Sequence, residues 1–84
     1  MFIRSQNRDV LINVNDICFN KLNIHSEIIY QFRCYGYGDD YYILGEYSTE
    51  EKALLVLDMI EKVSMYSGNT LFQTPADDEV EVWN

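Results

Sequence analysis

The sequence is poor in the residues that build most metal and redox centres, with two cysteines and one histidine among its 84 residues. Cys18, His25 and Cys34 follow a spacing that matches none of the usual zinc-ligand patterns. No secretory signal indicates an oxidising compartment, so the two cysteines are expected to be reduced and buried in apolar surroundings. We predict no metal site and no cofactor, and a disulfide is the alternative for the two cysteines.

Basic residues are also scarce, because six lysines and arginines stand against fourteen acids and give a net charge of −8. Direct binding to nucleic acid or to an anionic membrane needs clustered positive charge, and the first four bases of the chain are scattered. The chain lacks an apolar run of about 20 residues, the length of a membrane span, and its N-terminus lacks a signal-peptide core. Composition therefore predicts a cytoplasmic protein with no direct nucleic-acid or membrane partner.

The clearest positive signal is a helical pattern over residues 48–68. Ser48 and Glu51 have the spacing of a capping box, which begins a helix, and Gly68 stands where a helix often ends. Apolar residues three and four apart predict one face that packs on a sheet: Ala53, Val56, Leu57, Ile60 and Val63.

The segments on both sides of this helix read as short strands. Alternating apolar and polar residues predict four strands before it: 2–6, 10–15, 27–35 and 41–47. Residues 20–26 are expected to be a connection, and 70–74 a fifth strand that Pro75 ends. Gly45 is expected to mark a bulge or a close crossing of the helix backbone. The prediction is an α+β fold in which a curled, mainly antiparallel sheet of four to five strands carries one long helix packed across it (β-β-β-β-α-β).

A chain of this length makes one domain with a modest core. We assign residues 1–75 to a single α+β domain and residues 76–84 to an acidic C-terminal tail. Val80, Val82 and Trp83 give that tail enough apolar content to dock on the domain.

No group of residues has the pattern of a catalytic site. Gly36 and Gly38 frame a tyrosine, but Asp39 and Asp40 follow and would repel a phosphate, so this segment is expected to be a hairpin turn. The single histidine adjoins Ser26, and neighbours in a strand point to opposite faces, which argues against a dyad. We predict that the protein is not an enzyme.

Tyrosine is abundant, with seven residues of which six lie between positions 30 and 47. Tyrosine is enriched at protein interfaces, although cross-strand pairing within a small sheet also accounts for such clusters. The helix adds a shoulder of apolar residues beside its sheet-facing side. Together these give the candidate interface: Leu55, Met59, Tyr66, Tyr35, Tyr37 and Tyr42.

This surplus of apolar surface predicts a symmetric dimer, a homo-oligomer in which the shoulder is buried. The competing arrangement is a monomer in which Leu71, Phe72 and Trp83 fold back over the shoulder.

The segments IRSQ, LINVNDI, LGEYSTEEKALLVLDMI and FQTP, which span Phe2 to Pro75, resemble a recurring set of short uncharacterised proteins of Gram-positive bacteria and their phages. This resemblance implies the order of four strands and a helix and a cytoplasmic setting. It implies no activity, site residue or partner.

The sequence as a whole predicts a small non-enzymatic protein-interaction or assembly module that self-associates and has an unknown protein partner. The alternative is an acidic inhibitor that mimics nucleic acid and occupies the basic groove of a DNA-handling protein. The charge of −8, the small size and the acidic tail support that alternative.

Overall fold

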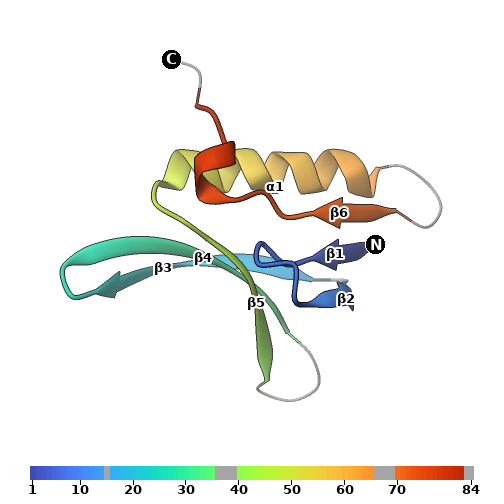
Figure 1. Ribbon diagram of the computed structural model, residues 1–84, viewed down its shortest axis with the longest axis horizontal. Coiled ribbons are helices and arrows are strands. Elements are labelled where there is room, and N and C mark those ends of the chain that lie inside the picture. Colours follow the sequence, from blue (N-terminus) through green and yellow to red (C-terminus); the bar gives the residue numbers. More distant parts are fainter. Residues whose placement is uncertain (15, 36–39, 66–69, 83–84) are drawn as a thin grey trace.

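The computed structural model describes residues 1–14, 16–35, 40–65 and 70–82, and these form one α-helix beside two small β-sheets (Figure 1). The α+β class is confirmed. The sheet differs from the expectation, because the strands divide into two sheets of three strands each. Most of the extra strand, residues 20–24, lies in the segment that the sequence predicts to be a connection.

The first sheet joins the two ends of the chain, in the order β2-β1-β6. β1 (Phe2–Arg4) pairs antiparallel with β2 (Leu11–Asn13), and both strands lie within segments predicted to be strands. It also pairs in parallel with β6 (Leu71–Gln73), which places the two terminal segments side by side. Ile12, Ile3 and Phe72 form one row across this sheet and face the core.

The second sheet is an antiparallel meander of β3 (Ile17–Ile24), β4 (Glu27–Tyr35) and β5 (Tyr41–Tyr47). β3 pairs with β4 from Ile17 to Ile24, so the prediction of a connection over 20–26 is wrong. His25 and Ser26 close this hairpin with φ angles of 49° and 69°, the left-handed conformation that matches the twist of two strands. The predicted turn at 36–40 falls mainly on residues 36–39, which lie outside the described residues.

The helix α1 (Glu50–Ser64) is shorter than the predicted segment, and its N-cap lies one residue after the predicted cap. Thr49 is its N-cap and accepts a bond from the Lys52 N–H at 3.2 Å. Ser48, the predicted cap, binds Asp77 instead. Met65 is the C-cap, and the predicted stop at Gly68 lies outside the described residues.

The core lies between α1 and the inner faces of both sheets. Ala53, Val56 and Ile60 are buried on the predicted face of α1, and Leu57 and Val63 are half-buried. The remaining buried apolar side chains come from five segments: Ile3, Phe32, Cys34, Leu44, Tyr47, Phe72 and Val80.

A β-bulge at Leu44 decides which residues of β5 face the core. Phe32 pairs with Gly45 and Arg33 with Ile43, so Leu44 is an extra residue on β5. The bulge expected near Gly45 is therefore confirmed. The alternative, a close crossing of the helix backbone, is not what the structure shows, because a Cβ atom at Gly45 would meet the side chains of Thr74 and Gln6.

The described part of the predicted acidic tail packs against the domain. A short 3₁₀ turn, η1 (Asp77–Glu79), follows Pro75. Val80 comes next and is only 4% exposed. Its burial fixes the course of the chain from β6 back toward the start of α1 (Figure 1).

Candidate interaction surface

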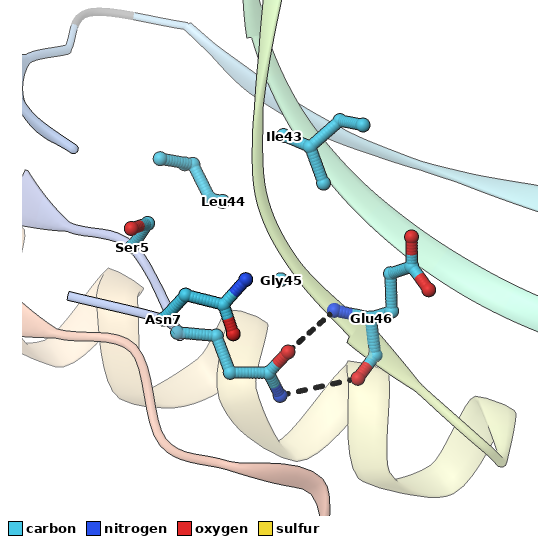
Figure 2. A pocket seen from close by; sticks show the side chains of 7 residues that line it. Ser5, Asn7, Ile43, Leu44, Gly45 and Glu46 are labelled. Carbon is cyan, nitrogen blue, oxygen red and sulfur yellow. Dashed lines mark hydrogen bonds between the residues drawn. The ribbon is translucent and has the colours of Figure 1, made fainter. Parts of the chain in front are cut away.

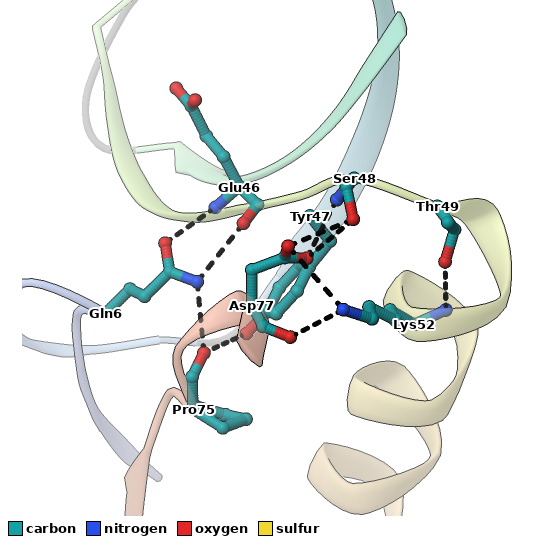
Figure 3. Close-up of polar contacts among 8 residues, drawn as sticks. All are labelled: Gln6, Glu46, Tyr47, Ser48, Thr49, Lys52, Pro75 and Asp77. Carbon is teal, nitrogen blue, oxygen red and sulfur yellow. Dashed lines mark hydrogen bonds and ion pairs between the residues drawn. The ribbon is translucent and has the colours of Figure 1, made fainter. Parts of the chain in front are cut away.

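A network of polar contacts ties the C-terminal segment to the corner between β5 and α1 (Figure 3). The Asp77 carboxylate accepts bonds from the backbone N–H and the hydroxyl of Ser48 at 2.9 to 3.1 Å and lies 3.6 Å from the Lys52 ammonium. Partial burial alone would raise the pKa of Asp77, but the Ser48 bonds and the Lys52 charge outweigh it and lower the pKa. The ionised carboxylate therefore stabilises this junction.

Tyr47 supplies the second part of the junction. Its hydroxyl donates to the Pro75 carbonyl at 2.6 Å, and the Gln6 amide donates to the same oxygen at 3.1 Å. Burial, and then the negative charges of Asp77 and Glu79, raise the pKa of Tyr47, so the hydroxyl stays protonated and keeps donating. These polar groups bind one another, which indicates a structural role.

The Gln6 side chain also covers the free edge of β5. Its amide donates to the Glu46 carbonyl at 3.1 Å and accepts from the Glu46 N–H at 3.0 Å, as a neighbouring strand would (Figure 3). Its own N–H binds the Leu44 carbonyl. Gln6 thus caps the edge of β5 at Leu44 and Glu46.

A polar pocket of about 220 Å³ lies beside this cap, between Ser5 and Asn7 on one side and the backbone of β5 on the other (Figure 2). The Ser5 hydroxyl donates to Asp9 at 2.9 Å and accepts from the Val10 N–H at 3.1 Å. These bonds hold the turn between β1 and β2 and leave the hydroxyl engaged.

The other strand edges in the described residues are short or charged. β1, β2 and β6 have three residues each, and β3 carries Lys21 near its middle. Short strands, edge lysines and capped edges all discourage pairing with a further strand. An interaction surface is better sought on a face than on an edge.

The side of the β3-β4-β5 sheet that points away from α1 is not covered by any described helix or strand. We call it the outer face. The strand register places these side chains on it: Cys18, Asn20, Leu22, Ile24, Glu27, Ile29, Gln31, Arg33, Tyr35, Tyr41, Ile43 and Glu46. Seven of these twelve are apolar or aromatic, and Tyr35, Tyr41 and Ile43 are 44% to 49% exposed. An apolar sheet face of this kind normally packs against another layer.

A chain of side-chain contacts orders one end of the outer face. Arg33 Nε donates to the side-chain Oε1 of Gln31 at 2.6 Å, and the Gln31 side-chain amide donates to the Glu46 carboxylate at 3.1 Å. The Arg33 guanidinium lies 4.4 Å from the Tyr41 ring centre, and Tyr41 lies 6.0 Å from the Tyr35 ring. These contacts offset the Arg33 charge and hold the side chains in place. Binding of a partner here would therefore cost little further side-chain entropy.

The structure separates the residues of the candidate interface predicted from the sequence. Tyr35 lies on the outer face, whereas Tyr42 lies on the opposite side of the same sheet, near the start of β5. Leu55 and Met59 lie on α1, where Leu55 is half-buried and Met59 is 40% exposed. Tyr37 and Tyr66 lie outside the described residues.

The two cysteines also differ from each other. Both are free, and Cys34 is buried as expected. Cys18 is exposed, so its predicted burial is wrong. The reason is that β3 is an edge strand and that Cys18 is directed to the outer face.

Sequence reasoning did not single out Tyr41 and Ile43 as surface partners. Strict alternation along β5 would place both on one face with Tyr47, which is buried. The extra residue at Leu44 breaks that alternation and directs Tyr41 and Ile43 outward. Gly45 is the only local signal of this change.

Comparisons of the chain with protein-family models, with curated proteins and with solved structures find no match. Within the described ranges, no helix has the length and apolar character that a membrane span requires.

Proposed function

We propose that this protein is a non-enzymatic interaction module that self-associates through the outer face of the β3-β4-β5 sheet. The observation that carries the proposal is the apolar and aromatic character of that face, which no described element covers. A second copy packed on it, sheet against sheet, would supply the missing layer.

The size of the exposed surface supports this proposal. The chain exposes 6137 Å², about 900 Å² more than the roughly 5200 Å² expected of a folded monomer of this mass. A protein–protein interface of ordinary size buries about 800 Å² on each partner. The molecule is also thin, with extents of 40 × 35 × 19 Å.

The distribution of charge favours a second copy as the occupant. Residues 50–82 carry a net charge of −6, and residues 1–49 carry −2. The outer face holds two acids and one base, Glu27, Glu46 and Arg33, and the last two are linked through Gln31. Packing two outer faces together keeps the acidic helices on opposite sides of the dimer, where their repulsion is screened.

Sedimentation equilibrium at tens of micromolar tests the proposal. The wild type is expected at about twice the monomer mass of 9.9 kDa, and Ile43→Glu at the monomer mass, because a buried unpaired carboxylate opposes association. Leu71→Glu is the matched control, since Leu71 is 60% exposed on the other sheet. It should remain a dimer.

Two outcomes would contradict the proposal. A wild type that sediments at the monomer mass rules out self-association in this range. A dimer that Met59→Glu dissociates and Ile43→Glu leaves intact would place the interface on α1. Circular dichroism of each variant establishes that it is folded.

The charge distribution also favours a second candidate, the acidic nucleic-acid mimic. Eight acids and two bases lie in residues 50–82, so α1 and the C-terminal segment form a strongly negative side. Binding to a DNA-handling protein by charge alone should disappear at about 0.5 M salt, where the Debye length is only a few Å. Association through the outer face should persist at that salt concentration.

A further inference from the structure

A second surface lies on the side of the molecule opposite the outer face, between α1 and the C-terminal segment. Burial of Val80 in the core brings Val82 alongside α1, and a groove of about 310 Å³ opens between them. Leu54, Leu55 and Val82 form its apolar floor. Leu54, in the second turn of α1, is 44% exposed.

Two carboxylates lie on either side of this floor. Glu51 and Asp58 line the groove and are seven residues apart, about two helical turns, so they lie on the same side of α1. Within the part of the chain that the structure describes, the single ion pair is Lys52–Asp77, which leaves Glu51 and Asp58 without a basic partner. The groove therefore combines an apolar centre with unpaired negative charge.

We propose that this groove binds a cationic amphipathic segment of a partner protein. An apolar side chain of the segment lies against Leu54, Leu55 and Val82, and its basic side chains meet Glu51 and Asp58. The volume is at the small end of the range of about 300–1,000 Å³ for ligand pockets, which suits an anchoring side chain. Recognition of a helix by a groove uses the same combination of spaced anchors and flanking charges.

Charge decides among the other occupants. Nucleic acid and anionic lipid are repelled by a side of the molecule that carries a net charge of −6 over residues 50–82. A second copy would bring an equally acidic side against it. A basic segment is attracted, and the groove is separate from the outer face, so this inference goes beyond self-association.

Fluorescence anisotropy with a labelled peptide tests the proposal. The probe is an amphipathic helix of about fifteen residues made of lysine and leucine, and the control peptide has the same composition in a scrambled order. At about 0.15 M salt, the amphipathic peptide should bind at micromolar concentration. The scrambled peptide should bind at least about tenfold more weakly, because it cannot align an anchor with flanking charges.

Two substitutions at exposed positions locate the site. Leu54→Ser and Asp58→Lys should each weaken binding about tenfold, because one removes the anchor contact and the other reverses a flanking charge. Glu27→Lys makes the same change of charge as Asp58→Lys at the far end of the β3-β4 hairpin. It should change the affinity by less than about twofold.

Three results would overturn the inference: equal binding of the two peptides, equal effects of Glu27→Lys and Asp58→Lys, or no effect of Leu54→Ser. The first two would indicate attraction by overall charge, as for a nucleic-acid mimic. Ile43→Glu should bind the peptide as tightly as the wild type does. Sedimentation therefore tests self-association, and peptide binding tests the groove, so either proposal can fail without the other.

Discussion

At the scale of single residues, Gly45 shows how closely the two sheets approach each other. A Cβ atom at this position would lie 3.0 Å from Thr74 Cγ2 and 3.3 Å from Gln6 Cβ. Thr74 is 2% exposed, and the Gln6 side chain is held by bonds to Glu46 and Pro75. Both neighbours are held in place, so a methyl group at position 45 would be crowded.

Gly45→Ala is therefore expected to lower the free energy of unfolding by about 1–2 kcal/mol, the usual cost of overpacking. The loss should exceed the small gain that an alanine makes by restricting the unfolded chain. Urea denaturation followed by circular dichroism gives the measurement.

Thr74→Ser supplies the matched control, because it removes the methyl group in question and keeps the hydroxyl. If the crowding argument is correct, Gly45→Ala should cost less in the Thr74→Ser background than in the wild type. If Gly45→Ala lowers the free energy of unfolding equally in both backgrounds, the Thr74 methyl group is not what crowds position 45.

The same region shows what a sequence cannot reveal about individual side chains. The alternation of β4 predicts one core face with Ile28, Tyr30, Phe32 and Cys34. Phe32 and Cys34 are buried, whereas Tyr30 is half-buried and Ile28, near the hairpin end, is 45% exposed. On β5 the extra residue Leu44 shifts the register, and the shift depends on pairing with another strand. Local sequence contains only the glycine beside it, so the outward positions of Tyr41 and Ile43 were not predictable.

At the scale of elements, a helix or strand is predictable from the sequence when the contacts that stabilise it lie close together along the chain. It is not predictable when those contacts come from distant segments. The sheet-facing side of α1 follows from its own periodicity, and Ala53, Val56 and Ile60 are buried as predicted. β3 lacks such a signal, because asparagines interrupt it and a His-Ser turn closes its hairpin. The parallel pairing of β1 with β6 joins segments about seventy residues apart and has no local signature.

The C-terminal segment shows the same limit at the start of α1. The capping box of Ser48 and Glu51 satisfies a local rule, but Asp77 binds Ser48 and Thr49 caps the helix instead. A contact with a residue 29 positions away thus displaces a local one.

The lowered pKa of Asp77 predicts how this segment responds to acid. A depressed pKa in the folded state means that the carboxylate contributes stability above its unfolded pKa of about 4. That contribution is lost as the pH falls through the lowered value in the folded state. Asp77→Asn should therefore be less stable than the wild type at pH 7, by about 1 kcal/mol for a side chain that remains partly solvated.

Urea denaturation as a function of pH measures this effect. The difference between Asp77→Asn and the wild type should shrink in acid, where the wild-type carboxylate is also neutral. Asp78→Asn changes the charge equally at an exposed neighbour and should follow the wild-type curve. A difference that stays constant down to the most acidic pH would contradict the assignment of the effect to ionised Asp77.

At the scale of the whole molecule, the protein has two unlike sides. One carries the apolar and aromatic outer face of the β3-β4-β5 sheet, and the other carries α1, the C-terminal segment and most of the net negative charge. Like charges discourage contact between two acidic sides, while the outer face holds few charges and those are largely compensated. The proposed self-association and the proposed recognition of a basic partner therefore use different sides of the molecule, and neither would block the other.

The two cysteines provide an intrinsic probe of that arrangement. Cys18 is exposed on the outer face, whereas Cys34 is buried, and burial raises the pKa of the Cys34 thiol, which opposes formation of the reactive thiolate. In the native protein, iodoacetamide should therefore modify Cys18 alone. In denaturant it should modify both.

If two outer faces pack together, the alkylation of Cys18 should slow as the protein concentration rises from well below to well above the dissociation constant of the dimer. Mass spectrometry of the digested protein gives the rate at each thiol, and Cys34 serves as the internal reference for folding. Ile43→Glu should abolish the concentration dependence, because the monomer leaves Cys18 open to the reagent at every concentration. A rate at Cys18 that does not depend on concentration, in a wild type that sedimentation shows to be dimeric, would mean that the copies meet on another surface. Sedimentation shows whether a dimer forms, and alkylation of Cys18 shows whether the outer face is covered in it.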